Sequence, residues 1–306
     1  MTSRVYRRLL VACLYIALMS GCGQPADVVL VVKPVIDPGQ MSFQGRVDIG
    51  GRKLFLECAG IGEPAVIFDA GLQSAGWKPA ALVAELSAVT RVCLYDRPNT
   101  PNGRSDHVQA ARTSQDIVDD LDALLAVAGV RPPWILVGHG FGGMNMTLFA
   151  AQHTDQVTGL ILMDPMPPNT IERWTMMLKF SELTVVPTAY QRPIADLAHG
   201  VAENIDLAAS TEQLRGMPGL GRMPVRLIAA RRPLEGWTTI DDPALRERLT
   251  EAWKDGRDFY NRVAPGIRVY DVDDGNGLMS SDSEELIRDE VIALLIRYRT
   301  CCGPLV

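Results

Sequence analysis

The sequence predicts an α/β fold in which helices cover both faces of a mostly parallel sheet. Three runs are continuously apolar, as strands buried on both faces are; they occupy residues 65–68, 134–137 and 160–163. Segments with helical periodicity lie between and after these runs, at residues 114–128, 143–152, 244–261 and 284–298. Strands that alternate with helices are typical of a parallel sheet.

The chain is long enough to bury one large core. It has 306 residues, of which 47% are apolar, so we expect one core domain interrupted by an insertion. The first helical segment follows Thr113 and Ser114. Either hydroxyl suits the N-cap position, because it can accept a hydrogen bond from a backbone N–H that the helix leaves free.

A glycine-framed turn follows the apolar run at 134–137. Residues 134–143 read Trp-Ile-Leu-Val-Gly-His-Gly-Phe-Gly-Gly, and a helical segment continues to Gln152. A strand, a tight turn and a helix in this order match the G-x-S-x-G nucleophile elbow, where a central serine exposes its hydroxyl above the sheet. Here the centre is Gly140. The glycine frame is therefore present, and the attacking oxygen is absent.

Several blocks, taken in order along the chain, resemble the α/β-hydrolase family. Residues 52–58, 65–72, 92–98, 103–106 and 160–164 resemble the second strand, the third strand with its oxyanion loop, the fourth strand, the loop after it, and the sixth strand. The resemblance implies an eight-stranded, mostly parallel sheet with flanking helices and a helical cap. It divides the rest of the chain into a hydrolase core at 45–166 and 223–306 and a cap insertion at 167–222. The residues before the core read as a signal peptide at 1–21 and a tether at 22–44, on the pattern described below.

The resemblance also assigns places to a catalytic triad, which in this family runs serine, acid, histidine along the chain. Gly140 takes the serine place and Asn276 the histidine place, and no histidine follows His199. Asp164, after the sixth strand, takes the acid place, although a structural carboxylate that caps the next turn would stand there equally well. The triad is therefore not intact.

Other parts of the catalytic machinery do not depend on those side chains. The resemblance assigns the oxyanion hole to the backbone N–H groups of Leu72 and Phe141, which need no particular side chain. His199, in the predicted cap, is a weak candidate for a replacement base. Ser74, beside the oxyanion loop, is a comparably weak candidate for a replacement nucleophile, since serine at such a position is usually a turn residue.

The predicted cap insertion is rich in large apolar side chains. They are Trp174, Met176, Met177, Leu178, Phe180, Leu183 and Tyr190. Methionine adapts to irregular shapes, so this lid could close an apolar pocket over the carboxyl edge of the sheet. Alternatively, these side chains only pack the cap onto the core, and the sequence leaves both interpretations open. We expect Asp96 and Arg97 to form a structural pair near the mouth of the pocket.

The N-terminus carries an export signal. Three arginines among the first eight residues precede an apolar run at 9–19, which is about half as long as a membrane-spanning helix. Residues 19–22, Met-Ser-Gly-Cys, resemble a bacterial lipobox. We therefore expect Cys22 to carry lipid and to anchor the exported protein to the bacterial cell membrane. The alternative is an ordinary cleaved signal peptide.

Charge and metal-ligand patterns exclude several partners. Removal of residues 1–21 takes away three arginines and no acid, so the formal net charge falls from −6 to −9. That charge argues against nucleic acid as a partner and against electrostatic adsorption of the whole chain to an anionic membrane. No Cys-x-x-Cys motif or His/Cys cluster occurs, so we expect no metal and no cofactor.

Export also changes how the cysteines are interpreted, because disulfides persist in oxidising compartments. In the family's sheet order the second and fourth strands are neighbours, so the resemblance implies a disulfide between Cys58 and Cys93. Two buried free thiols are the alternative. Nothing in the sequence determines the state of Cys301 and Cys302.

Two functional hypotheses follow. The first is a lipid-anchored α/β-hydrolase-like protein that is catalytically inactive, because Gly140 and Asn276 replace the nucleophile and the base. Such a protein would keep a pocket for a small apolar ligand or bind an envelope protein. The second is a hydrolase of carboxylic esters with a non-standard catalytic arrangement.

Overall fold

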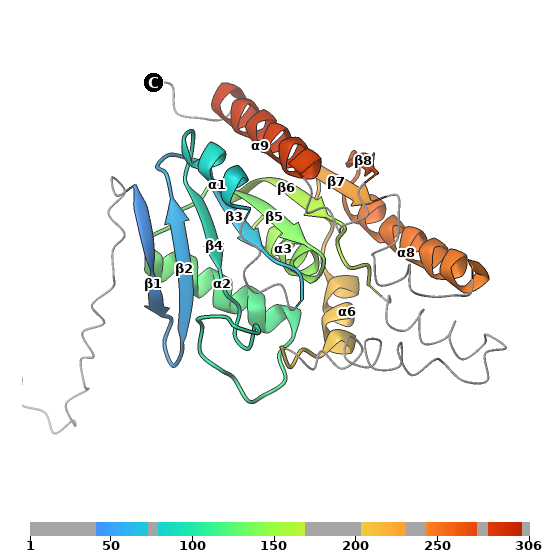
Figure 1. Ribbon diagram of the computed structural model, residues 1–306, viewed down its shortest axis with the longest axis horizontal. Coiled ribbons are helices and arrows are strands. Elements are labelled where there is room, and N and C mark those ends of the chain that lie inside the picture. Colours follow the sequence, from blue (N-terminus) through green and yellow to red (C-terminus); the bar gives the residue numbers. More distant parts are fainter. Residues whose placement is uncertain (1–40, 73–78, 169–202, 231–242, 274–280, 302–306) are drawn as a thin grey trace, which may run out of the picture. The chain divides into compact units, whose positions relative to one another are not determined.

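The computed structural model describes residues 41–72, 79–168, 203–230, 243–273 and 281–301, and these contain the predicted α/β architecture (Figure 1). The expected signal peptide, nearly all of the tether, most of the cap insertion and Asn276 lie outside the described residues. The domain boundaries drawn from the sequence therefore stay predictions.

Eight strands form one sheet in the order β1-β2-β4-β3-β5-β6-β7-β8. They are β1 (Ser42–Asp48), β2 (Lys53–Ala59), β3 (Ala65–Asp69), β4 (Val92–Tyr95), β5 (Trp134–His139), β6 (Val157–Met163), β7 (Val225–Ala230) and β8 (Arg268–Val272). β2 pairs antiparallel with both β1 and β4. The other five pairs are parallel, which confirms the predicted mostly parallel sheet of eight strands.

The described helices are α1 (Ala80–Ser87), α2 (Ser114–Ala128), α3 (Phe141–Gln152), α6 (Leu207–Gly216), α8 (Pro243–Val263) and α9 (Ser281–Cys301). Thr113 caps α2: its side chain accepts from the Asp116 N–H, and the Asp116 carboxylate accepts from the Thr113 N–H. The two bonds satisfy two backbone donors reciprocally. α3 begins at Phe141, two residues earlier than the sequence predicted, because the helix starts directly after the tight turn.

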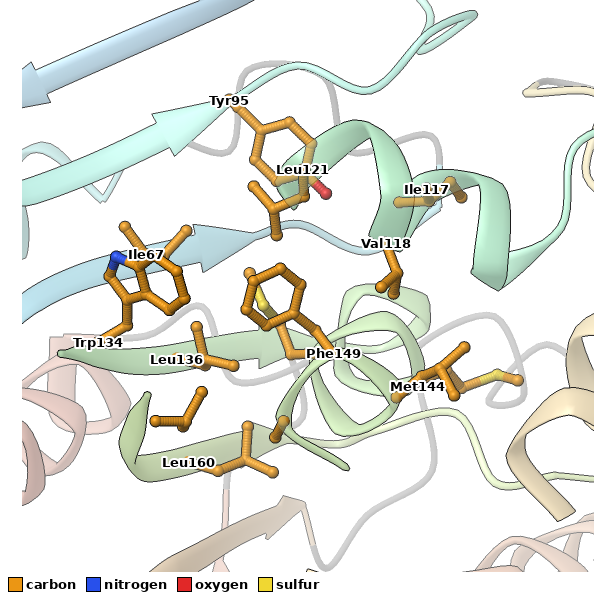
Figure 2. Close-up of a cluster of buried hydrophobic side chains, with 14 of the residues drawn as sticks. Ile67, Tyr95, Ile117, Val118, Leu121, Trp134, Leu136, Met144, Phe149 and Leu160 are labelled. Carbon is orange, nitrogen blue, oxygen red and sulfur yellow. The ribbon is translucent and has the colours of Figure 1, made fainter. Parts of the chain in front are cut away.

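The helices cover both faces of the sheet. Side chains of α1 and α9 pack on one face, whereas those of α2, α3, α6 and α8 pack on the other. Figure 2 shows part of the second cluster, in which Trp134 of β5 and Phe149 of α3 meet edge to face with ring centroids 5.6 Å apart. Burial on both faces is the reason that the central strands are apolar throughout.

Within the described residues, no helix combines the length and the apolar character that a membrane span needs.

The disulfide that the family's sheet order implies is present. Cys58 on β2 stands directly opposite Cys93 on β4 in the antiparallel register, and the two residues are bonded, with their Cα atoms 4.1 Å apart. Cys301, at the end of α9, is a free and exposed thiol. Cys302 lies outside the described residues.

Loss of the disulfide should destabilise the fold. Replacing Cys58 and Cys93 together by Ala should lower the free energy of unfolding by about 2–4 kcal/mol, measured by urea denaturation, because the bond restricts the unfolded chain. Cys301→Ala is the control and should leave stability unchanged. Free, alkylatable thiols at both strand positions in the exported protein would contradict the expectation.

Candidate functional site

The turn between β5 and α3 has the backbone geometry of a nucleophile elbow. Gly140 has a φ of +53° and a ψ of −116°, a backbone conformation that residues other than glycine rarely adopt. Its N–H donates to the Met163 carbonyl at 3.0 Å, and its carbonyl accepts from the Met166 N–H at 2.8 Å. Both bonds tie the centre of the turn to the end of β6 and the residues that follow.

The glycines around this turn are required by close packing. A Cβ on Gly142 would stand 2.2 Å from the Asp69 carbonyl oxygen, one on Gly138 would stand 2.6 Å from the Gly142 carbonyl oxygen, and one on Gly143 would stand 2.7 Å from the Pro165 Cβ. These distances leave no room for a side chain, so the frame holds α3 against the ends of β3 and β5.

Gly140 itself is different, because space for a side chain exists there. A Cβ on Gly140 would meet only the Gly71 Cα within 4 Å, at 3.6 Å, which is ordinary van der Waals contact. The position therefore resists a side chain through backbone conformation and not through crowding. A serine could occupy it at the modest cost of a strained residue, on the order of 1–3 kcal/mol.

The predicted acid, Asp164, lies directly after β6 and is buried. Its Oδ1 accepts from the Ala230 N–H at 2.9 Å, and its own N–H donates to the Ile228 carbonyl. The carboxylate therefore joins the ends of β6 and β7, which is the structural role that the sequence left open beside the catalytic one. Asn276, the residue in the histidine place, lies outside the described residues, as do His199 and Ser74.

Arg97 holds the predicted oxyanion loop. Its guanidinium donates to the carbonyls of Ala70 at 2.6 Å and Gly71 at 2.8 Å, directly before Leu72. The same group lies 5.6 Å from the ring centroid of Phe141, within reach of a cation–π interaction. The backbone around both expected oxyanion donors, Leu72 and Phe141, is therefore braced by one buried cation.

Two buried carboxylates surround that cation. Arg97 forms ion pairs with Asp69 at the end of β3 and with Glu203, to which it donates two bonds of 2.9 Å. The Asn145 amide donates to the other oxygen of Asp69 at 3.0 Å. We call Arg97, Asp69, Glu203 and Asn145 the arginine cluster. All four side chains are buried, so their charges and hydrogen bonds must satisfy one another.

Burial and mutual attraction shift the pKa values in this cluster. Burial raises the pKa of Asp69, although the attraction of Arg97 opposes the rise. For Arg97, burial alone would lower the pKa, but the Glu203 and Asp69 carboxylates raise it well above its usual value. Burial also raises the pKa of Tyr95 well above its usual value, with a further contribution from the Asp69 charge. Arg97 therefore stays charged, and Tyr95 stays neutral.

The expected pairing of Asp96 with Arg97 is wrong. Asp96 bonds instead to Arg104, whose backbone N–H and side chain donate to it at 2.9 and 3.0 Å. Adjacent residues at the end of a strand point in opposite directions, so Asp96 and Arg97 reach different partners. Both are structural, as predicted, but in separate ion pairs.

Glu203 lies at the start of the described segment 203–230. Asn204 accepts at its carbonyl from the Arg112 N–H, and the Asp206 N–H donates back to the Arg112 carbonyl, which makes a short parallel bridge. No sequence pattern predicted the roles of Glu203, Asp69 and Asn145. Asp69 could have been identified from the sequence, because a lone carboxylate at the end of a fully apolar strand needs a buried partner.

Among the cavities lined by described residues, two lie at the amino ends of the strands, and neither is lined by Gly140. The larger, of about 760 Å³, lies among loops that enter β3, β4 and β5, and the other has about 360 Å³. The apolar pocket expected beneath the cap depends on side chains at 174–190, which lie outside the described residues. In the described part of the chain, no three His, Cys, Asp or Glu side chains gather as a metal site would require.

The sequence of this chain is similar to one protein family and to several known proteins. The model of a family described as "Alpha/beta hydrolase family" matches residues 62–291. The uncharacterized protein YqjL of Bacillus subtilis is 33% identical over 102 residues, which are 33% of this chain and 39% of that protein. An uncharacterized protein of Schizosaccharomyces pombe is 40% identical over 79 residues, 26% of this chain and 14% of that protein. These matches span well under two thirds of the relatives' own length.

Among solved structures, the mouse alpha/beta hydrolase domain-containing protein 10 superposes with a TM-score of 0.57 at 18% sequence identity. The superposition covers 83% of this chain and 99% of the mouse chain. At that identity, the similarity establishes the fold alone.

Removing the cation of the arginine cluster should be costly. Arg97→Met should lower the free energy of unfolding by about 3–5 kcal/mol, because it leaves Asp69 and Glu203 as buried carboxylates without their counter-charge. Adding Asp69→Asn and Glu203→Gln to that variant should recover part of the loss. The measurement is urea denaturation.

Arg215→Met provides the matched control, since Arg215 forms an exposed ion pair with Glu212 on α6. It should change stability by less than about 1 kcal/mol. If Arg97→Met were no more destabilising than this control, the cluster would not brace the oxyanion loop.

Proposed function

The chain belongs to the alpha/beta hydrolase family, and we propose that it is a member without serine-dependent acyl transfer, which has kept the fold for binding. The observation that carries this proposal is Gly140. It occupies the centre of a turn with elbow geometry, between glycines that packing requires. An attacking hydroxyl is absent at the one position of the fold that is built to expose it.

The energetic consequence of that absence is large. Removing the nucleophile or the base of such a triad typically costs about a million-fold in turnover, or roughly 8 kcal/mol of transition-state stabilisation. An oxyanion hole acting alone leaves about a thousand-fold acceleration over water. If Asn276 fills the histidine place, two of the three roles are empty, and a braced oxyanion loop cannot replace them.

A second candidate function is hydrolysis of carboxylic esters by a non-standard arrangement. The observation that favours it is that other parts of the catalytic machinery remain in place. The arginine cluster holds the oxyanion loop, and Asp164 keeps the acid place. Such a mechanism needs another nucleophile and base, for which Ser74 and His199 are the candidates. Nothing in the described residues brings a nucleophile and a base together at Gly140.

We further propose that the protein is a lipoprotein of the bacterial cell membrane, anchored through Cys22, and that it binds a small apolar ligand or an envelope protein. The support is the sequence of the N-terminus: a basic start, a short apolar run and Met-Ser-Gly-Cys at 19–22. Two or more acyl chains on one cysteine are enough for stable anchoring.

Ester hydrolysis distinguishes the two candidate functions. The mature protein should not hydrolyse short-chain or medium-chain p-nitrophenyl esters faster than a heat-denatured sample, because the nucleophile is missing. Gly140→Ser should lower the free energy of unfolding by roughly 1 kcal/mol through backbone strain, and should remain inactive without a base. Gly140→Ser combined with Asn276→His should gain measurable turnover, since triad members act as a unit.

Hydrolysis by the unaltered protein, abolished by Ser74→Ala or His199→Ala, would instead establish the second candidate. Activity in Gly140→Ser alone would show that another residue serves as base. Asn276→His alone is the matched control, and it should stay inactive because it supplies a base without a nucleophile.

Membrane attachment should depend on Cys22. Cys22→Ser should move the protein out of the membrane fraction of fractionated cells, because the apolar run at 9–19 is too short to span a bilayer. A variant that stayed membrane-bound after washing with high salt and carbonate would contradict the lipid anchor.

A further inference from the structure

The loops at the amino ends of the parallel strands form a surface of distinct charge, which we call the amino edge. It consists of Met41, residues 59–64, 88–91, 129–133, 153–156, 217–224 and 264–268, and the last turn of α9, residues 297–301. This edge carries six arginines and only two carboxylates. The arginines are Arg91, Arg131, Arg222, Arg268, Arg297 and Arg299; the carboxylates are Glu63 and Asp155. All of these except Arg91 are exposed.

Exposed apolar side chains gather at the same edge. Of the five large apolar residues that are exposed in the described chain, four lie there or one turn away: Met41 (69%), Ile61 (47%), Val89 (44%) and Ile296 (57%). The end of α9 is fixed beside them, because the Arg299 side chain donates to the Val89 carbonyl at 2.8 Å. Single exposed apolar residues are ordinary. Several of them among arginines are typical of surfaces that lie at a membrane interface.

The amino edge is also hollowed. The cavity of about 760 Å³ opens between Ile61, Val89, Arg91, Arg131 and Arg299. Glu63 also lines this hollow, so its three arginines stand beside one carboxylate. Guanidinium groups bind phosphate oxygens through paired hydrogen bonds, and a hollow with this excess of arginine and with apolar side chains at its wall suits a phosphate headgroup and the start of its acyl chains.

The chain enters the fold at this edge. The Met41 carbonyl accepts from the Gly60 N–H at 2.7 Å, and in Figure 1 β1 begins at the edge of the sheet where β4 begins and α9 ends. Residues 23–40 connect Met41 to the proposed lipid-bearing Cys22. Eighteen residues reach at most about 60 Å when extended, so the anchor holds the domain within reach of the bilayer, and the tether joins it at the amino edge.

We propose that the amino edge lies on anionic phospholipid headgroups, so that Gly140 and the carboxyl ends of the strands face away from the membrane. The proposal rests on the lipid anchor of the proposed function, which brings the edge to the lipid surface. Its chemistry is the attraction of arginine for lipid phosphates, supplemented by shallow insertion of Ile61, Val89 and Met41.

The negative net charge of the chain does not oppose this orientation. At the opposite ends of the strands, the carboxylates of Asp96, Asp106 and Glu203 are paired with Arg104, Arg46 and Arg97. Charges more than about 10 Å apart are largely screened at physiological salt, so lipid headgroups respond to the nearest edge and not to the whole molecule. The ligand or partner of the carboxyl edge would then approach from the aqueous side.

Vesicle binding tests the proposal separately from the anchor. The mature chain, residues 22–306, carries Cys22→Ser so that no acyl chain contributes. It should sediment with vesicles of phosphatidylglycerol mixed with phosphatidylcholine at physiological salt, where the distant carboxylates are screened. It should not sediment with phosphatidylcholine alone, nor with either vesicle at high salt.

Reversing three exposed arginines of the edge, Arg131→Glu, Arg222→Glu and Arg297→Glu, should weaken binding at least about tenfold, since each arginine near an anionic surface contributes about a fivefold gain in affinity. The matched control reverses three exposed bases elsewhere, Lys53→Glu, Arg248→Glu and Lys254→Glu, with the same change in net charge. This control should lose less than about threefold. Ile61→Ser with Val89→Ser should also weaken binding. Circular dichroism checks that each variant is folded.

Three outcomes would overturn the proposal: no sedimentation with phosphatidylglycerol vesicles, equal losses in the edge variant and its control, or binding that is independent of lipid charge. None of them bears on the lipid anchor, whose failure would appear only in the fractionation of cells. Conversely, a failed anchor would leave the vesicle result standing as a property of the edge.

Discussion

The pairing of Arg97 with two buried carboxylates is the constraint on which the carboxyl side of this fold depends. One guanidinium reaches the end of β3 through Asp69, the oxyanion loop through the carbonyls of Ala70 and Gly71, and the returning chain through Glu203. A buried ion pair contributes little net stability relative to a well-packed apolar core. It does specify geometry, because the charged groups can be satisfied only when all the segments are in place.

That geometry is the scaffold of a catalytic site, and the centre of the scaffold is a glycine. The turn at Gly140 keeps the backbone angles of an elbow, and the neighbouring glycines keep α3 in close contact with β3. A glycine at the centre removes the strain that a serine would cause there. In the function proposed here, a glycine at this position leaves the site without its nucleophile and relaxes the turn, while packing and hydrogen bonds preserve the surrounding structure.

The sequence predicted those features that depend on local pattern. Continuous apolar runs predicted the central strands, and the glycine spacing around Gly140 predicted the elbow. The hydroxyls of Thr113 and Ser114 predicted the start of α2, which Thr113 caps, and the resemblance implied the partner of Cys58. The arginine cluster was not predictable, because it joins residues that are far apart in sequence, such as Asp69 and Glu203, and no periodicity relates them. Asp96 and Arg97 were paired wrongly, because adjacency in sequence was taken for contact across a strand end.

The charge of a particular surface is likewise not predictable from the net charge of the chain. The whole chain is acidic, which argues against attraction to anionic lipid. Yet six arginines and two carboxylates lie on the amino edge, whereas at the other edge Asp69, Asp96 and Glu203 are paired with arginines. Net charge is a property of the sequence, whereas an edge is a property of the fold. A membrane-anchored domain with these two edges would present its elbow to the aqueous side.

The central claim, that the elbow has lost its nucleophile, is tested most directly by covalent labelling. The mature protein is incubated with a fluorophosphonate probe, and its intact mass is then measured, with an active serine esterase as the positive control. The account predicts no adduct on the unaltered chain, because Gly140 offers no hydroxyl. A stoichiometric adduct that peptide mapping assigns to any serine would contradict it.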